Sequence, residues 1–233
     1  YLLTEAKKNS VPVFILGGGS NLVVADEGID KLVISTEAFD FCNFQDELLS
    51  CGSGCTFEKI TDFCIKNEIS GLENFAGLPG TTGGATFMNA RCYDVSISDV
   101  ISSVKYLDLS DFNEKTYFLD STDWDYKKSP FQTGDKIVTQ VNFNVKKGNS
   151  KEIEEKSLSF INDRKNKGHF KFPSAGSVFK NNRNFGKPSG KIIDEVGLRG
   201  ISVGDAQVAP WHGNFIINNG NASANDVKTL VKN

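Results

Sequence analysis

Two glycine-rich segments constrain how this chain folds. The first, Gly17–Leu22, directly follows an apolar run at 11–16 that predicts a buried strand. The second spans Gly77–Ala85. Glycines let backbone N–H groups converge on an anion without a Cβ in the way. Leu22 stands where the dinucleotide fingerprint needs a third glycine, and no Gly-Lys-Ser/Thr follows the second segment. The segments therefore indicate either ordinary tight turns or phosphate-binding turns outside the Rossmann and P-loop folds.

Hydrophobic periodicity predicts strands and helices that are interleaved, without the regular alternation of a doubly wound fold. Further strands are expected at 31–34, 48–51, 104–109 and 136–145, and helices at 56–67, 150–167, 191–196 and 226–231. The segment 71–90 is expected to be a loop with one helical turn. Ser223 and Asp226 have the spacing of a capping box. The pattern favours the α+β class.

A basic window interrupts a chain whose net charge is -3. It contains no acidic residue, and its basic residues are Arg164, Lys165, Lys167, Lys171, Lys180, Arg183, Lys187 and Lys191. The window begins within the helix predicted at 150–167, where Arg164 falls on the same face as Ile153 and Phe160. A charge on such a face extends to solvent or meets a partner. The window is therefore either a solvated basic face or an anion-binding surface that includes Ser177.

Several functional classes are disfavoured by composition. Five cysteines without a ligand-spaced quartet, with two histidines, argue against a metal site; we expect none, and we expect reduced structural thiols. The acidic pI of about 5.5 and the lack of an aromatic-basic repeat argue against nucleic-acid binding. No run of 18 apolar residues predicts a membrane span.

Six motifs in register resemble one family, the UDP-N-acetylenolpyruvoylglucosamine reductases. The motifs are Gly17–Leu22, Gly77–Ala85, Asp125–Ser129, Ala175–Asn181, Ala206–Val208 and His212–Phe215. The resemblance implies a flavin-binding domain of the vanillyl-alcohol-oxidase (PCMH) type in two lobes, at 1–37 and 38–165. It also implies a C-terminal α+β substrate-binding domain at 166–233. The spacing between Phe131 and Ser177 resembles the shorter, second subclass, which lacks a tyrosine loop.

By resemblance, the glycine-rich segments hold the pyrophosphate of non-covalent FAD. The implied cofactor-binding residues are Leu16, Gly17, Gly18, Gly19, Ser20, Asn21, Leu22, Gly77, Pro79, Gly80, Thr81, Thr82, Gly83, Gly84, Ala85 and Val138.

The implied reaction has two halves: NADPH reduces the flavin, and the flavin then passes hydride to UDP-N-acetylglucosamine enolpyruvate, giving UDP-N-acetylmuramate for peptidoglycan. Ser177 matches the family's proton donor, and Lys127 stands where the family usually has the arginine that polarises the substrate carboxylate. Lysine keeps the charge but loses the bidentate geometry. The expected substrate-binding residues are Tyr126, Arg164, Lys167, Lys180, Asn181, Gln207 and Asn214. For Gln207 and Asn214 the alternative is a structural role, in a turn or at the end of a strand.

The family also has a glutamate near its C-terminus, and no residue up to Asn233 matches it. We therefore expect the natural chain to extend at both ends. One alternative is another flavoenzyme of the same fold; the absence of a histidine before His169 counts against covalent flavin attachment. A second is a non-catalytic or diverged FAD-binding protein. We expect a monomer in the bacterial cytoplasm.

Overall fold

The computed structural model describes residues 1–232. They form two compact units, one comprising 1–19 and 31–161, the other comprising 20–30 and the chain from Asn162 onward. The segment 20–30 is tied to the second unit because the Ala224 N–H donates to the Asp26 carboxylate, at 2.9 and 3.1 Å. The three-part division with boundaries at 37 and 165 stays a prediction.

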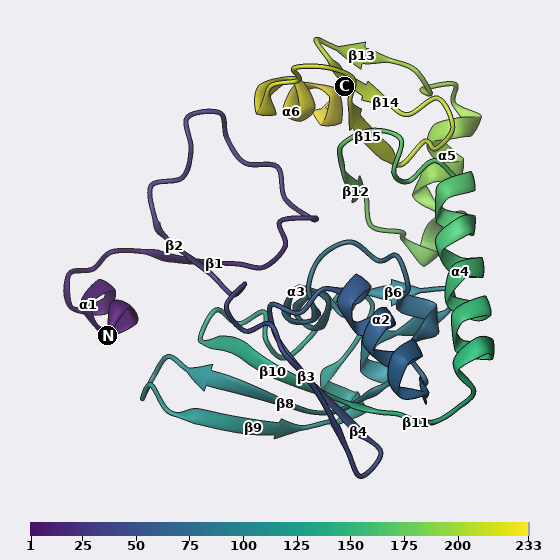
Figure 1. The fold of residues 1–233 in the computed structure, drawn as a ribbon. Helices are drawn as coiled ribbons and strands as arrows, with labels where there is room; N and C mark the ends of the chain where they lie inside the picture. Colours follow the sequence, from purple (N-terminus) through teal and green to yellow (C-terminus); the bar gives the residue numbers. More distant parts are fainter. Residues whose placement is uncertain (233) are drawn as a thin grey trace. The chain divides into compact units, whose positions relative to one another are not determined.

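The first unit is built on a five-stranded antiparallel sheet of order β3-β4-β10-β8-β9 (Figure 1). Its strands are β3 (Cys42–Gln45), β4 (Leu48–Gly52), β8 (Ile101–Asp108), β9 (Glu114–Phe118) and β10 (Lys136–Asn144). The helices of this unit include α2 (Phe57–Asn67) and α3 (Thr82–Phe87). Phe57, Phe75 and Phe143 are at most 1% exposed and lie in the core, which stabilises the unit through buried apolar area.

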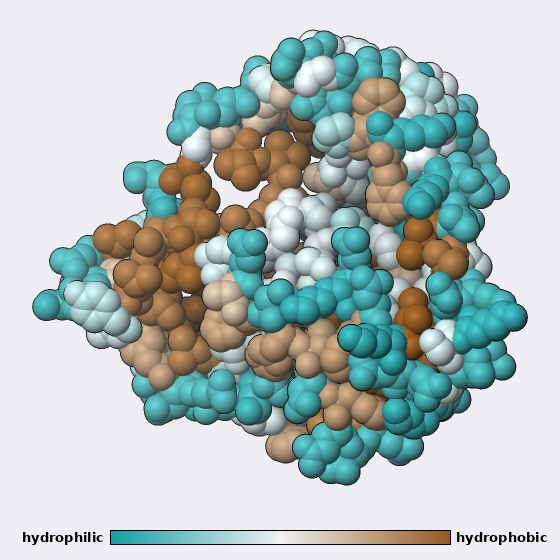
Figure 2. Space-filling view, in the orientation of Figure 1, coloured by the Kyte–Doolittle hydropathy of each residue, from teal (hydrophilic) through white to brown (hydrophobic). Residues whose placement is uncertain are grey.

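The remaining elements of this unit are short. They are α1 (Leu2–Lys8), the antiparallel pairs β5 (Ile69–Ser70) with β11 (Lys146–Lys147) and β6 (Arg91–Cys92) with β7 (Val95–Ser96), and the 3-10 turns Glu73–Phe75, Ile97–Asp99 and Ser121–Asp123. A separate parallel pair joins β1 (Val13–Leu16) to β2 (Leu32–Ser35). All four β1 residues are half-buried, and hydrophobic surface is visible in this part of the molecule (Figure 2).

Helix α4 (Ser150–Asn166) confirms the predicted stripe. Ile153, Ser157 and Arg164 are buried and Phe160 is half-buried, while the intervening Glu154 and Glu155 are exposed. Arg164 therefore lies on the apolar face of the helix, as its spacing predicts.

The second unit contains a four-stranded antiparallel sheet of order β12-β15-β14-β13. Its elements are β12 (Ser174–Ser177), a 3-10 turn at Arg183–Phe185, α5 (Ser189–Glu195), β13 (Ser202–Val203), β14 (Ala206–Val208), β15 (Phe215–Asn218) and α6 (Ala224–Lys232). The predicted capping box begins α6: Ser223 N–H donates to Asp226, and Asp226 N–H donates to Ser223 Oγ. Helices and strands follow the α+β organisation that the sequence predicts.

Candidate functional site

Within the first unit, Gly17 and Gly18 of the first glycine-rich segment lie against Gly80 and Thr81 of the second. A Cβ added to Gly17 would be 2.8 Å from Thr81 Oγ1, and a Cβ added to Gly18 would be 2.9 Å from Gly80 Cα. Neither distance leaves room for a side chain. The glycines at 17 and 18 are therefore required by the close approach of residues that are distant in sequence, and ordinary tight turns do not account for them.

A third turn, Gly52–Cys55, holds the second glycine segment in place. The Thr82 N–H donates to Cys55 O at 2.9 Å, the Thr82 hydroxyl donates to Gly52 O at 2.6 Å, and the Gly83 N–H donates to Ser53 O at 2.9 Å. A Cβ on Gly83 would be 2.8 Å from Ser53 Cβ. Sequence reasoning missed this turn, although the Gly52-Ser53-Gly54 spacing between a strand and a helix was a usable signal.

The hydroxyls of Thr81 and Thr82 serve the protein's own structure. Thr81 Oγ1 accepts a hydrogen bond from Gly84 N–H and caps α3, and Thr82 is 0% exposed. Gly18, Gly19, Pro79 and Gly84, in contrast, are exposed, and Gly17 and Gly80 are half-buried. We call the surface formed by Gly17–Gly19 and Pro79–Gly84 the cradle. Its accessible part is thus largely backbone. A surface of this kind suits a dinucleotide pyrophosphate because N–H groups reach it without side chains intervening.

Two other predicted cofactor residues flank this cradle. Leu16 ends β1 and is half-buried. Val138 is 8% exposed in β10, and the carbonyl of the next residue, Thr139, accepts a hydrogen bond from Ser53 N–H at 2.9 Å. Val138 therefore lies one residue from the bond that connects the sheet to the turn at Gly52–Cys55.

Tyr126 and Lys127 form a tight turn in the first unit. Lys127 has φ +57°, a left-handed conformation that is uncommon outside glycine. The turn is fixed because Asn89 Nδ2 donates to Asp125 O at 2.9 Å and Gln132 Nε2 donates to Lys127 O at 3.1 Å. Tyr126 is 40% exposed and Lys127 half-buried, so both side chains are accessible.

In the second unit, Ser177 is exposed at the end of β12, opposite Phe215. The segment that follows it is held by Asn214. The Phe179 N–H donates to Asn214 Oδ1, and Asn214 Nδ2 donates to Phe179 O, both at 2.8 Å. Asn214 is 5% exposed. Its amide is therefore engaged with protein backbone, which supports a positioning role for it.

The neighbouring predicted residues also have internal partners. The Ser189 hydroxyl donates to Lys180 O, and the Ser189 N–H donates to Asn181 Oδ1, both at 2.9 Å. These bonds join the start of α5 to this segment, while the Lys180 side chain is exposed. Gln207 Nε2 donates to Gly200 O and to Ser202 Oγ, each at 3.1 Å.

The charge around the end of α4 is positive. Burial and the nearby charge of Arg164, followed by His212, lower the pKa of His169 to about 4. His169 is therefore neutral at pH 7, and it packs on the Phe215 ring at 4.9 Å between centroids. Lys167 is exposed and bonds Asp163 at 2.7 Å. Such a field favours an anionic ligand.

The remaining predicted cofactor residues are distributed between the two units. Gly77 and Ala85 belong to the first unit, whereas Ser20, Asn21 and Leu22 fall within the segment that groups with the second. Asn21 and Leu22 are exposed and Ser20 is half-buried.

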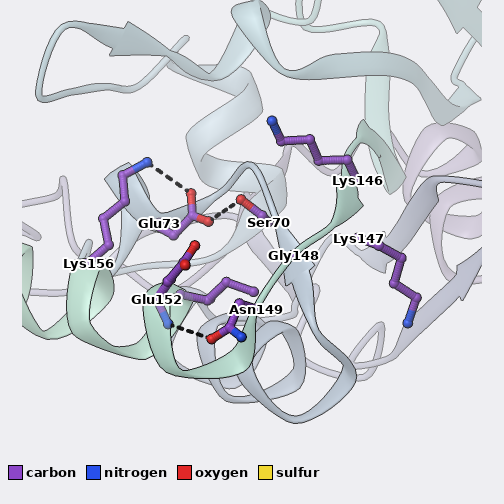
Figure 3. Close-up of a pocket in the computed structure, with 9 residues that line it drawn as sticks. Ser70, Glu73, Lys146, Lys147, Gly148, Asn149, Glu152 and Lys156 are labelled. Atoms are coloured by element: carbon purple, nitrogen blue, oxygen red, sulfur yellow. Dashed lines mark hydrogen bonds and ion pairs between the residues drawn. The ribbon is translucent and has the colours of Figure 1, made fainter.

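A polar pocket in the first unit is separate from the glycine cradle (Figure 3). At its wall, the buried Glu73 carboxylate accepts from Ser70 Oγ at 2.7 Å and from Gly71 N–H, and it pairs with Lys156 Nζ at 3.4 Å. These bonds satisfy the carboxylate and lower the pKa of Glu73 although burial raises it. The contacts connect α4 to the β5 region, and we assign the pocket a structural role.

Two family domains match this chain. The C-terminal domain of UDP-N-acetylenolpyruvoylglucosamine reductase matches residues 168–233, and an FAD binding domain matches residues 1–111. No helix in the described part of the chain is long and apolar enough to cross a membrane.

Whole-chain comparisons agree with these domains. The UDP-N-acetylenolpyruvoylglucosamine reductase of Treponema denticola is 47% identical, over 97% of this chain and 75% of its own length. That of Treponema pallidum is 39% identical, over 99% of this chain and 78% of its own length. The crystal structure of the reductase from Thermus caldophilus covers 99% of this chain and 84% of its own, at 34% identity and a TM-score of 0.84. The chain belongs to the UDP-N-acetylenolpyruvoylglucosamine reductase family.

Proposed function

We infer that this protein is an FAD-containing oxidoreductase that uses NADPH to reduce UDP-N-acetylglucosamine enolpyruvate to UDP-N-acetylmuramate, a step in peptidoglycan synthesis. Family membership at up to 47% identity supports this function. The structural observation that carries it is the close approach of Gly17 to the Thr81 hydroxyl and of Gly18 to the Gly80 backbone, which leaves no room for a side chain at either glycine. That contact leaves an accessible backbone surface where the family binds its cofactor.

FAD supplies the chemistry of hydride transfer when it is bound. We propose that the backbone of Gly17–Gly19 and Gly80–Thr81 holds its pyrophosphate. The N–H groups from Thr82 to Ala85 bond to acceptors within the protein, at Cys55, Ser53 and Thr81. They fix the shape of the cradle, so the direct contacts fall to the preceding residues. Leu16 and Val138 are proposed apolar contacts of the same cofactor.

Two side chains are proposed to act on the substrate directly. The Lys127 ammonium would stabilise negative charge that develops at the substrate carboxylate, because a preorganised cation costs no reorganisation during the reaction. The left-handed turn fixes the backbone at Lys127, and with it the direction in which the side chain leaves the chain. Ser177 would donate a proton to the substrate carbon next to the carboxylate. Its exposure at the end of β12 supports this role.

Substrate binding is proposed to involve Tyr126 and a group of basic side chains. Arg164, Lys167 and Lys180 supply positive charge for the diphosphate and carboxylate groups of the substrate. Asn181 and Gln207 are proposed polar contacts, although each also has a partner within the protein. For Asn214 we propose positioning of the Ser177–Lys180 segment in place of direct contact.

We propose that the protein is a monomer in the bacterial cytoplasm. The five free thiols and the use of NADPH and a UDP-sugar support this location. Light scattering on the purified protein would test the monomer.

Anaerobic stopped-flow absorbance at the flavin band tests the reaction. Reduction by NADPH should bleach the band, and addition of UDP-N-acetylglucosamine enolpyruvate should restore it. A protein that bleaches but does not recover with this substrate would be a different flavoenzyme. A protein that binds no flavin would refute the proposal altogether.

A further inference from the structure

Three of the five cysteines come together in the first unit. Cys42 in β3 and Cys51 in β4 are register partners, and their sulfurs are 3.8 Å apart. Cys55, in the turn after β4, places its sulfur 3.3 Å from that of Cys42. All three thiols are free. Reduced structural thiols were expected from the sequence. Their spacing does not reveal this contact, because the contact depends on strand pairing.

The three thiols differ in accessibility and in acidity. Cys42 is half-buried, whereas Cys51 and Cys55 are 0% exposed. Hydrogen bonds with Cys51 and then Cys55 lower the pKa of Cys42, and the hydrogen bond with Cys42 raises the pKa of Cys55. Cys42 is therefore the more exposed and the more acidic thiol of the close pair, so an oxidant reaches it first, with the Cys55 thiol beside it.

The charged groups beside this cluster are Lys59 and Asp40. Lys59 Nζ pairs with the Asp40 carboxylate at 2.8 Å. The lysine lowers the pKa of Cys42 and the aspartate raises it, so these two charges act in opposite directions. The cluster itself, held by the register of β3 and β4, accounts for most of the asymmetry between the thiols.

The turn that contains Cys55 is connected to the cofactor cradle by hydrogen bonds. Cys55 O accepts from Thr82 N–H at 2.9 Å, and Gly52 O accepts from the Thr82 hydroxyl at 2.6 Å. Ser53 O accepts from Gly83 N–H at 2.9 Å. A displacement of Cys55 therefore reaches the first turn of α3, where the second glycine segment begins.

We propose that Cys42 and Cys55 form an oxidant-sensitive thiol pair whose oxidation to a disulfide weakens the binding of FAD. This inference rests on the proposed placement of FAD at the glycine segments. The sulfurs are in van der Waals contact, and bond formation must draw Cys55 closer to Cys42. Because Thr82 is bonded to Cys55, that movement distorts the contact of Thr81 with Gly17.

The chemistry balances with hydrogen peroxide as the oxidant. The Cys42 thiolate attacks one peroxide oxygen and the O–O bond breaks, which gives a sulfenic acid at Cys42 and releases hydroxide that takes up a proton to become water. The Cys55 sulfur then attacks the Cys42 sulfur, its thiol proton is lost, and the sulfenic hydroxyl leaves as a second water. A dithiol reductant reverses the step by thiol–disulfide exchange.

Cys51 is the competing partner for Cys42. Its sulfur is farther away, at 3.8 Å, and its position opposite Cys42 in the strand pair places it in the sheet, not in the turn that bonds Thr82. A disulfide between Cys42 and Cys51 would act on Thr82 only through the neighbouring Gly52, and so less directly than one to Cys55. Identification of the linked residues decides between the two partners.

The test treats the FAD-loaded protein with hydrogen peroxide, blocks free thiols with N-ethylmaleimide, and maps the peptides by mass spectrometry. We expect a disulfide between Cys42 and Cys55, seen as a peptide mass two hydrogens below that of the reduced cysteines. Release of FAD should accompany it and appear as a rise in flavin fluorescence. Dithiothreitol should reverse both changes. Cys42→Ser should abolish the crosslink and the release, whereas the matched control Cys64→Ser, at a buried cysteine of α2, should retain both.

Cys55→Ala provides a second variant, in case Cys42→Ser is poorly folded. It should still form the sulfenic acid at Cys42, detected with a dimedone probe, but should keep its FAD. A crosslink to Cys51, no crosslink, or a Cys42–Cys55 crosslink without release of FAD would each overturn the inference. A reduced protein that holds no FAD would instead contradict the proposed function, and the peptide map would still report on the thiol pair.

Discussion

The role of Asn214 gives the sharpest test of how the second unit presents Ser177. The Asn214 amide makes two hydrogen bonds of 2.8 Å with the backbone of Phe179, one as acceptor and one as donor. Replacement by alanine removes both and leaves two backbone groups of Phe179 without these partners. The segment that follows Ser177 would then be held by fewer bonds, chiefly the one from Val178 N–H to Asn214 O at 2.9 Å.

The expected loss of stability can be worked out from these bonds. Each hydrogen bond contributes about 1 kcal/mol net, and Phe179 itself is exposed, so Asn214→Ala should cost about 2 kcal/mol. With a urea m-value of about 2 kcal/mol/M, the unfolding midpoint should fall by about 1 M. Misplacement of Ser177 should slow flavin reoxidation by the enol ether about a hundredfold, while reduction by NADPH is unchanged.

The assay combines urea unfolding with stopped-flow measurement of the two half-reactions. Asn218→Ala is a matched control, since Asn218 Oδ1 also accepts two backbone hydrogen bonds, from Gly220 and Ala222 N–H, at 3.0 and 2.9 Å. It should lose comparable stability without slowing reoxidation. If Asn214→Ala kept its stability but bound the enol ether more weakly, Asn214 would contact the substrate and the positioning argument would be wrong.

Three further predictions concern catalysis and pH. Ser177→Ala should slow reoxidation by the enol ether about 10²–10⁴-fold and leave reduction by NADPH intact in stopped flow; equal losses in both halves would make Ser177 a binding or folding residue. Lys127→Arg should preserve or raise the reoxidation rate, and a large loss would show that this turn does not accommodate the family's arginine. The lowered pKa of His169 means that the unfolded chain binds more protons between about pH 4 and pH 6.5. Stability should therefore fall as the pH drops through this window, and His169→Gln should make the fall in urea midpoints less steep. A smaller fall should persist in this variant, because the pKa of His212 is also lowered.

Local signals in the sequence predicted much of the fold because they act over a few residues. The periodicity of Ile153, Ser157 and Arg164 predicted the buried face of α4, and Ser223 with Asp226 predicted the start of α6. The segment 71–90 was predicted as a loop with a helical turn, and it contains the 3-10 turn Glu73–Phe75 and the short helix α3. Both features follow from glycine content and spacing alone.

What could not be predicted depends on partners that are distant in the chain. Cys42 meets Cys55 only because β3 and β4 pair in one register. For Asn214 the sequence left a ligand contact and a structural role open, and the partner that favours the structural role, Phe179, lies 35 positions earlier. The order of the motifs in the sequence identified the candidate residues. Whether such a residue positions its neighbours or contacts a ligand depends on its hydrogen-bond partners, which the structure shows.

The cradle also has a consequence for the order in which the protein is made. It depends on contacts between four distant parts of the chain. Gly17 lies against the second glycine segment, the Gly83 N–H donates to Ser53 O, and the Ser53 N–H donates to Thr139 O. A ribosome must therefore release β10 before the first glycine segment has its complete support. Since domains fold as units during synthesis, flavin capture should be a late event, well after the glycines at 17–19 have left the exit tunnel.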